Sequence, residues 1–208
     1  MNVPFSCQRH LVASGELPGS PSELSSWADR GCAIACVTMI LNYYGRRVSL
    51  TEVLVAALAR RAFDPERGWR HTRLVEVLQA YGLTAYRRNW RLLDGHERDY
   101  LAGRALNAAA DAEMAMVRHQ MVAEGMWRIG TLLAAQVPVI VSTYRPPGDR
   151  SSIGHQLVLV ATDGDEIVYH DPAHESGASS RCSRETFGAN WKGTAIVAHD
   201  GVVEPQPQ

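Results

Sequence analysis

The segment that most constrains this chain is the almost entirely apolar stretch 31–45, GCAIACVTMILNYYG. Its composition predicts a helix over about 33–44 that ends at Gly45, and a helix that is apolar on every face has to be buried. Cys32 lies at the first turn of this helix. There the positive end of the helix dipole and unpaired N–H groups favour the thiolate, which is the nucleophilic form of cysteine. The segment therefore predicts a buried central helix with a candidate nucleophile at its tip.

Composition narrows the class of protein. A chain of 208 residues can form one domain with a substantial core, and 46% hydrophobic and 21% charged residues are ordinary for a globular protein. The formal net charge of -1 provides no field to recruit nucleic acid or an anionic membrane, so we expect neither as a partner. The longest apolar segment, 32–41, is too short to span a bilayer. With no secretory signal visible, we expect a cytoplasmic protein.

Four cysteines occur, and a cytoplasmic location favours free thiols over disulfides. We expect Cys36, one turn inside the apolar helix, to pack in the core. A disulfide between Cys7 and Cys182 stays open as an alternative.

The order of the predicted elements indicates an α+β domain, because helical patterns precede a series of strands. Ser49 and Glu52 have the spacing of a capping box and begin a helix expected to reach about Arg61. An amphipathic helix is expected from His71 or Thr72 to Gly82, after a turn at 63–68. A further helix is predicted over 128–136, and strands are predicted at 83–90, 137–142, 156–161, 166–170 and 194–198.

We expect a single domain over 1–208. It would carry a loop insertion near 14–27, a helical insertion near 91–126 and a flexible tail near 201–208. The segment 91–126 is expected to form an extra helical layer, with a lid or a substrate-selecting insertion as the alternative.

Two successive strands carry candidates for a base and for the group that orients it. His155 begins one strand and Asp171 ends the next. A three-residue loop at 162–164, with Gly164 in the left-handed region, would place His155 directly opposite Asp171 on one face. A two-residue turn would shift this register by one. Because Cys–His hydrolysis needs a base beside the thiol and a third group that orients the base, the spacing suits such chemistry.

These motifs together resemble the C39 and C39-like papain-fold cysteine peptidases, in particular stand-alone bacterial members. The matching elements are Cys32 followed by Met39 and Tyr43-Tyr44-Gly45, then Gly154-His155 before an apolar strand, and then Asp171-Pro172. Segments at 68–83, 132–140 and 187–191 agree in order. The resemblance covers most of 3–198 except roughly 91–126.

The resemblance implies a fold, a set of site residues and an activity. The fold would be α+β and papain-like, with a helical lobe whose buried nucleophile helix packs on an antiparallel β-sheet. Cys32 would be the nucleophile, His155 the general base and then acid, and Asp171 the orienting carboxylate. Gln8 would donate to the oxyanion together with the Cys32 N–H, although it lies 24 positions before Cys32, a wider gap than usual. The implied activity is hydrolysis of a peptide or amide bond through a thioester, with no cofactor.

Three other functions are kept beside this one. The same triad could pass the acyl group to an amine, which would make the protein an acyltransferase or a peptide cyclase. A non-catalytic peptide-binding domain is a further alternative. The third is a structural zinc site, since Cys32 and Cys36 together with His170 and His174 imitate a Cys2His2 ligand set. In every reading but the last, the partner is a peptide or another amide-containing molecule. The sequence does not indicate which oligomeric state the protein adopts.

Overall fold

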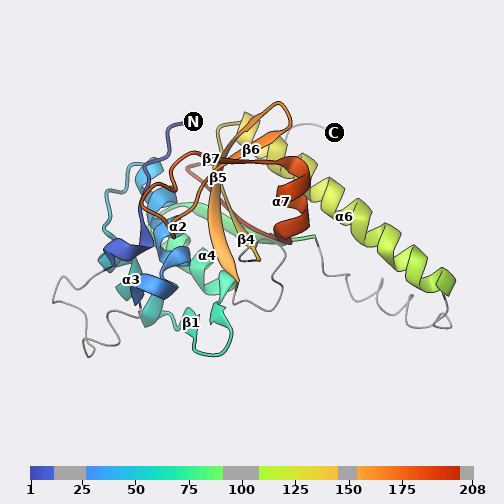
Figure 1. Cartoon of the computed structure of the whole chain (residues 1–208). Coiled ribbons are helices and arrows are strands. Elements are labelled where there is room, and N and C mark those ends of the chain that lie inside the picture. The colour runs from blue at the N-terminus through green and yellow to red at the C-terminus, as the bar shows by residue number, and fades with distance from the viewer. Residues whose placement is uncertain (12–26, 91–107, 145–153, 202–208) are drawn as a thin grey trace.

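A computed structural model describes residues 1–11, 27–90, 108–144 and 154–201, and its elements confirm the expected α+β class (Figure 1). The helical elements are η1 (Gln8–His10), α2 (Cys32–Tyr43), α3 (Leu50–Ala59), α4 (His71–Ala80), α6 (Ala108–Ala134) and α7 (Arg184–Asn190). The strands are β1 (Phe63–Asp64), β2 (Gly68–Trp69), β3 (Thr84–Asn89), β4 (Val139–Thr143), β5 (His155–Asp163), β6 (Glu166–His170), β7 (Ser180–Ser183) and β8 (Trp191–His199). The expected insertion near 14–27 and the tail near 201–208 lie almost wholly outside the described residues, as does the first half of 91–126.

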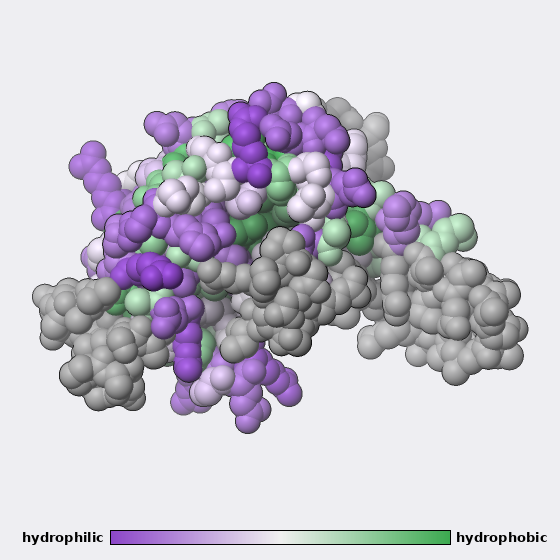
Figure 2. Space-filling view, in the orientation of Figure 1, coloured by the Kyte–Doolittle hydropathy of each residue, from purple (hydrophilic) through white to green (hydrophobic). Residues whose placement is uncertain are grey.

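A six-stranded antiparallel sheet, in the order β3-β8-β4-β5-β6-β7, separates two hydrophobic cores. Because side chains alternate along a strand, neighbouring residues enter different cores. Ile140 and Val158 pack with α2, α3 and α4, whereas Val139 and Leu159 pack with α6 and α7 on the opposite face. Figure 1 shows the α2–α4 layer and the long α6 on different sides of the sheet. In the same orientation, hydrophilic residues cover much of the described surface (Figure 2).

Helix α2 is buried as its composition predicts. Every side chain from Cys32 to Leu41 is buried, which explains why this helix tolerates no charged residue. Thr38 carries a polar hydroxyl within this buried stretch, and the hydroxyl donates to the carbonyl oxygen of Ile34 at 2.8 Å. The helix begins one residue earlier than expected, at Cys32, and Gly45, where the helix was expected to end, is in the left-handed region with φ 77°.

The two following helices also form near their predicted bounds. The capping box at Ser49 and Glu52 is present in both directions, and α3 then ends at Ala59, two residues before the expected end. Helix α4 begins at His71 and is followed by Gly82 with φ 81°.

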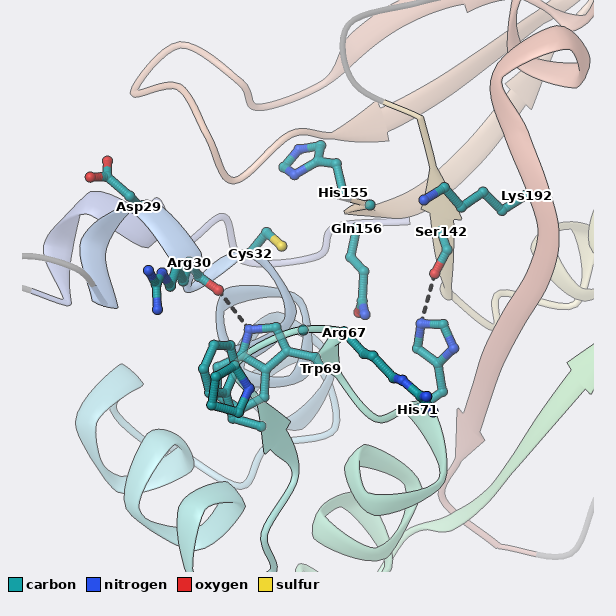
Figure 3. Close-up of a pocket in the computed structure, with 14 residues that line it drawn as sticks. Asp29, Arg30, Cys32, Arg67, Trp69, His71, Ser142, His155, Gln156 and Lys192 are labelled. Carbon is teal, nitrogen blue, oxygen red and sulfur yellow. Dashed lines mark hydrogen bonds between the residues drawn. The ribbon is translucent and has the colours of Figure 1, made fainter. Parts of the chain in front are cut away.

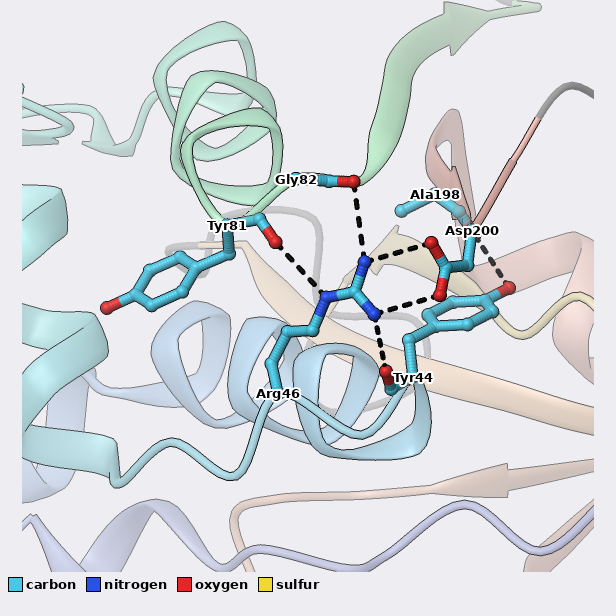
Figure 4. Close-up of polar contacts among 6 residues, drawn as sticks. All are labelled: Tyr44, Arg46, Tyr81, Gly82, Ala198 and Asp200. Carbon is cyan, nitrogen blue, oxygen red and sulfur yellow. Dashed lines mark hydrogen bonds and ion pairs between the residues drawn. The ribbon is translucent and has the colours of Figure 1, made fainter.

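Arg46 joins the ends of α2, α4 and β8 (Figure 4). Its guanidinium donates to the carbonyl oxygens of Tyr44, Tyr81 and Gly82 and forms a two-pronged ion pair with Asp200. The Tyr44 hydroxyl adds a 3.0 Å hydrogen bond to the carbonyl oxygen of Ala198. The carbonyl groups left over at the ends of two helices are thereby satisfied, which fixes the far end of α2 against the sheet.

The structure departs from the sequence prediction in one long helix and in several short elements. The expected helix over 128–136 is the last part of α6, a helix of 27 residues. The expected turn at 63–68 carries a two-stranded pair in which Phe63 lies opposite Trp69. Strand β7 and helix α7 were not predicted. None of the helices in the described segments is long and apolar enough to cross a membrane.

Gly31, at the start of α2, is expected to be intolerant of a side chain. A Cβ there would overlap a methyl group of Leu11 and the carbonyl oxygen of Trp27. We expect Gly31→Ala to lower the free energy of unfolding by about 1–3 kcal/mol, as substitutions at overpacked sites do.

Gly130→Ala in α6 is the matched control. No heavy atom lies within 4 Å of the added carbon there. This change should raise stability by up to about 1 kcal/mol. Urea denaturation checks both, and equal effects of the two changes would contradict the packing account.

Candidate active site

Cys32 occupies the N-terminal tip of α2 and lines a cavity of about 340 Å³ (Figure 3). Its side chain is buried. Burial opposes ionisation, yet a hydrogen bond to His155, the charge of that imidazole and the backbone N–H groups of Gln156 and Ala33 together hold the pKa of the Cys32 thiol below its ordinary value. The N-cap residue of α2 is Gly31, which has no side chain to accept from the first-turn N–H groups, and these groups lie at the same end of the helix as the thiol. The local environment therefore favours a thiolate.

His155, the first residue of β5, connects Cys32 to Asp171. Its Nε2 lies 2.7 Å from Asp171 Oδ1, which leaves Nδ1 as the ring nitrogen available to the thiol. Burial lowers the pKa of His155, but the hydrogen bonds with Asp171 and Cys32 and the charges of both raise it to about 9. An imidazolium beside a thiolate is the charge state that these two shifts favour.

The contact between His155 and Asp171 arises from a different backbone path than expected. Strands β5 and β6 join through a two-residue turn, because Asp163 pairs directly with Glu166 and Gly164 has φ 58°. The register also shifts between Leu159 and Ala161. The predicted register, with a three-residue loop and His155 opposite Asp171, is therefore wrong. Asp171 reaches the imidazole because the chain turns sharply after β6.

That turn, at 171–177, is held by its own hydrogen bonds and by the N-terminal segment. The N–H of Asp171 donates to Gly177 O, and Asp171 Oδ1 accepts from the N–H of Ala173. A Cβ on Gly177 would overlap the carbonyl oxygen of Asp171, so this close approach requires glycine. The backbone N–H of Gln8 donates to Pro172 O at 2.8 Å. The carboxylate is thus positioned by segments from both ends of the chain.

Gln8 is buried, but its side chain does not line the cavity. Its Nε2 donates to the carbonyl oxygens of Ala28 and Asp29, each at 3.0 Å, and its Oε1 is buried without a hydrogen-bond partner among the described residues. These bonds fix the backbone that leads into α2. For Gln8 to face an oxyanion, at least one of them has to be exchanged for the substrate.

The zinc alternative is not assembled. Both ring nitrogens of His170 are occupied, Nε2 with the carbonyl oxygen of Val3 and Nδ1 with the N–H of Ser179. Burial raises the pKa of Cys36 well above its ordinary value, so this thiol stays protonated in the core. Within the described part of the chain, three potential ligands gather only at Cys7, His10 and Glu175. All four cysteines are free, which also answers the open question about Cys7 and Cys182.

Several cavity residues were missed by sequence reasoning. Gln156 and Ser142 enter the cavity from adjacent strands, and His71 Nε2 lies 2.8 Å from the Ser142 hydroxyl (Figure 3). Lys192 and Arg67 also line the cavity. The one signal in the sequence is that Lys192 is the single lysine of the chain. Composition alone does not indicate that this lysine lies in the cavity.

We expect Gln8→Ala to separate two roles for this side chain. If its amide donates to an oxyanion, the variant should cleave peptides about 10²-fold more slowly. Alkylation of Cys32 by iodoacetamide, which forms no oxyanion, should keep its rate. Parallel loss of both rates would show that Gln8 only holds the backbone before α2. Equal peptide cleavage by variant and parent would contradict the oxyanion role.

Comparisons with known proteins agree with this architecture. A crystal structure from Bacillus anthracis, of a protein named as a C39-like peptidase, superimposes with a TM-score of 0.57 at 18% identity, covering 95% of this chain and 94% of the other. A double-glycine motif protease from an AMS/PCAT transporter, in complex with the leader peptide, gives a TM-score of 0.51 at 15% identity, covering 95% and 91%. The peptidase domain of Streptococcus ComA, a bifunctional ABC transporter of a quorum-sensing pathway, gives 0.50 at 18% identity, covering 82% and 91%.

At these identities the solved structures establish the fold alone, and no curated protein matches the sequence. The family comparison is stronger, because a single family matches residues 1–199, nearly the whole chain. Its cysteine-peptidase character fits a structure in which a buried helix brings a thiol to an imidazole and a carboxylate. On this match the chain belongs to the Peptidase_C39 like family.

Proposed function

We propose that the chain is a thiol-dependent hydrolase that cleaves a peptide or amide bond, with Cys32 as nucleophile, His155 as base and acid, and Asp171 as the orienting carboxylate. One observation carries the proposal. Three separate elements bring these groups into one hydrogen-bonded series, in which His155 bonds Asp171 at 2.7 Å and also bonds Cys32. The pKa directions at Cys32 and His155 support the same assignment, since they favour the ion pair that attacks a carbonyl.

The reaction would begin with transfer of the Cys32 proton to His155. The thiolate attacks the carbonyl carbon, a C–S bond forms, and the carbonyl oxygen takes the negative charge. The Cys32 backbone N–H at the helix tip, with the Gln8 amide after release from its backbone partners, would stabilise this oxyanion. His155 returns the proton to the leaving nitrogen as the C–N bond breaks. Water then attacks the thioester, and His155 acts again as base and acid.

A peptide is the proposed substrate class. The cavity of about 340 Å³ beside Cys32 is large enough for a few side chains, as the proposal requires. The solved double-glycine protease is bound to a leader peptide. We extend to this chain only the general class, an extended peptide whose carbonyl reaches the tip of α2.

The proposal is tested with a peptide library derived from a digested proteome, incubated with the protein in H₂¹⁸O. Hydrolysis creates new C-termini that carry one ¹⁸O, and mass spectrometry reads them. The Cys32→Ala protein, prepared in parallel, provides the background. New ¹⁸O-labelled termini with the parent protein alone support hydrolysis. When a small amine is also added, products joined to that amine instead identify an acyltransferase, and cyclised peptides identify a cyclase. Peptide capture by both proteins, with no new bonds, identifies a binding domain and contradicts the proposal.

A further inference from the structure

A lysine ammonium group lies next to Gly154, the residue directly before the proposed catalytic histidine, and has no carboxylate partner among the described residues. Lys192, in β8, lines the same cavity as Cys32. Its Nζ is 4.8 Å from the centroid of the Tyr144 ring and packs over Gly154, where any Cβ would overlap it. Among the described residues it forms no ion pair. A glycine directly before His155 thus keeps open the space that this ammonium fills.

Positive charge exceeds negative charge around the cavity. Among the described residues, Arg30, Arg67 and Lys192 line it against one carboxylate, that of Asp29, which lies at the opposite end of the view from Lys192 (Figure 3). No ion pair joins any of these four within the described segments. His71 adds no charge, because burial, with the charges of Arg87 and Lys192, lowers its pKa to about 4. The cavity therefore attracts an anion.

Gln156 supplies a second unsatisfied group in the same cavity. It is two residues from Val158 in β5, so both side chains lie on the same face of the sheet, and Val158 packs in the α2 core. The Gln156 side chain therefore enters from the α2 side of the sheet. It is 4% exposed, and its Oε1 is buried with no hydrogen-bond partner among the described residues. Figure 3 shows the amide pointing into the space between Cys32 and Ser142. A buried amide oxygen left unpaired costs about 1–3 kcal/mol, which a ligand N–H would offset.

We propose that Lys192 and Gln156 form a subsite for a peptide that bears a carboxylate close to the bond to be cleaved. The ammonium binds the carboxylate, the Gln156 Oε1 accepts an N–H of the same peptide, and Arg67 adds to the positive potential. This inference rests on the proposed function, because the subsite shares its cavity with Cys32. The carboxylate belongs either to an aspartate or glutamate side chain or to the C-terminus of the peptide, and the two sources have the same chemistry.

The test uses peptides built around a central epoxide that is flanked by two amide bonds. This electrophile alkylates thiolates, carries no charge itself and accepts residues on either side. One pair compares glutamate with glutamine, and a second pair compares a free C-terminal carboxylate with a carboxamide. The rate of Cys32 alkylation is followed by intact mass on the full chain. One carboxylate probe should react about tenfold or more faster than its amide match, as expected for a charge-assisted hydrogen bond. The pair that shows the preference identifies the source of the carboxylate.

Lys192→Met should abolish this preference, whereas Arg128→Met, which removes one positive charge from exposed α6, should leave it intact. Gln156→Leu should slow all peptide probes about tenfold. Iodoacetamide is the common reference, and the rate of each peptide probe is divided by the rate at which iodoacetamide alkylates Cys32 in the same variant. Equal alkylation rates for the two members of each probe pair, or a preference that survives Lys192→Met, overturn the subsite. If iodoacetamide still labels Cys32 in that case, the proposed function stands without the subsite. Failure of iodoacetamide to label Cys32 contradicts the proposed function, and the subsite falls with it.

Discussion

Cys32→Ala should reduce peptide cleavage by about 10⁴-fold or more, because it removes the thiol that the proposal assigns as the nucleophile of the covalent intermediate. The fold should be retained. The side chain at this position is 8% exposed, and alanine fits the same helical site without a new clash. Cleavage is measured on a peptide found in the ¹⁸O experiment, and thermal unfolding is followed on the same samples.

Cys36→Ala is the matched control for this prediction. Cys36 lies one turn deeper in α2, fully buried, and its raised pKa keeps it protonated. The variant should lose some stability through a small cavity but keep its cleavage rate per folded molecule. Full activity of Cys32→Ala, or loss of activity in Cys36→Ala with the fold intact, would show that Cys32 is not the nucleophile.

His155→Ala should reduce cleavage by about 10²- to 10⁴-fold, the usual range for a general acid–base group. It should also change the pH dependence of Cys32. In the parent, the hydrogen bond and charge of His155 overcome the effect of burial and keep the pKa of the thiol below its ordinary value of 9.0. Without His155, burial is opposed only by backbone N–H groups, so the pKa should rise.

The direction of the change in the Cys32 pKa can be determined from alkylation rates measured between pH 5 and 10. In the parent, Cys32 should already react at neutral pH, because its thiolate persists down to its lowered pKa. In His155→Ala the reaction should be slow at neutral pH and recover only in alkaline solution. Asp171→Asn should give an intermediate case, since it removes one of the groups that raise the pKa of His155 to about 9. A pH profile unchanged by His155→Ala would contradict the proposed ion pair.

Much of the α2–α4 layer could be predicted because local signals and burial agree there. The segment around Cys32 is apolar on every face, and the capping box at Ser49 specifies where α3 begins. The class of the sheet follows from the order of the strands. In contrast, the length of α6 was underestimated because its residues include scattered polar side chains and glycines, which obscure the apolar face.

The site was only partly predictable, for a physical reason. A hairpin register depends on the turn that the chain adopts, and Asp163-Gly164-Asp165 is compatible with more than one. His155 and Asp171 meet nonetheless, because the 171–177 turn and the N–H of Gln8 move Asp171 into place. Gln156 and Lys192 come together through long-range strand packing, which leaves no local pattern in the sequence.

The central claim, that Cys32 is a reactive thiolate paired with His155, is tested most directly by competitive alkylation of the parent protein. Folded protein is treated with iodoacetamide at pH 7, and the rates of Cys32 and Cys36 are compared by mass spectrometry of the peptide that contains both. The account predicts that Cys32 is alkylated far faster than Cys36. Slow alkylation of both thiols at similar rates would identify Cys32 as an inert core residue and would contradict the account.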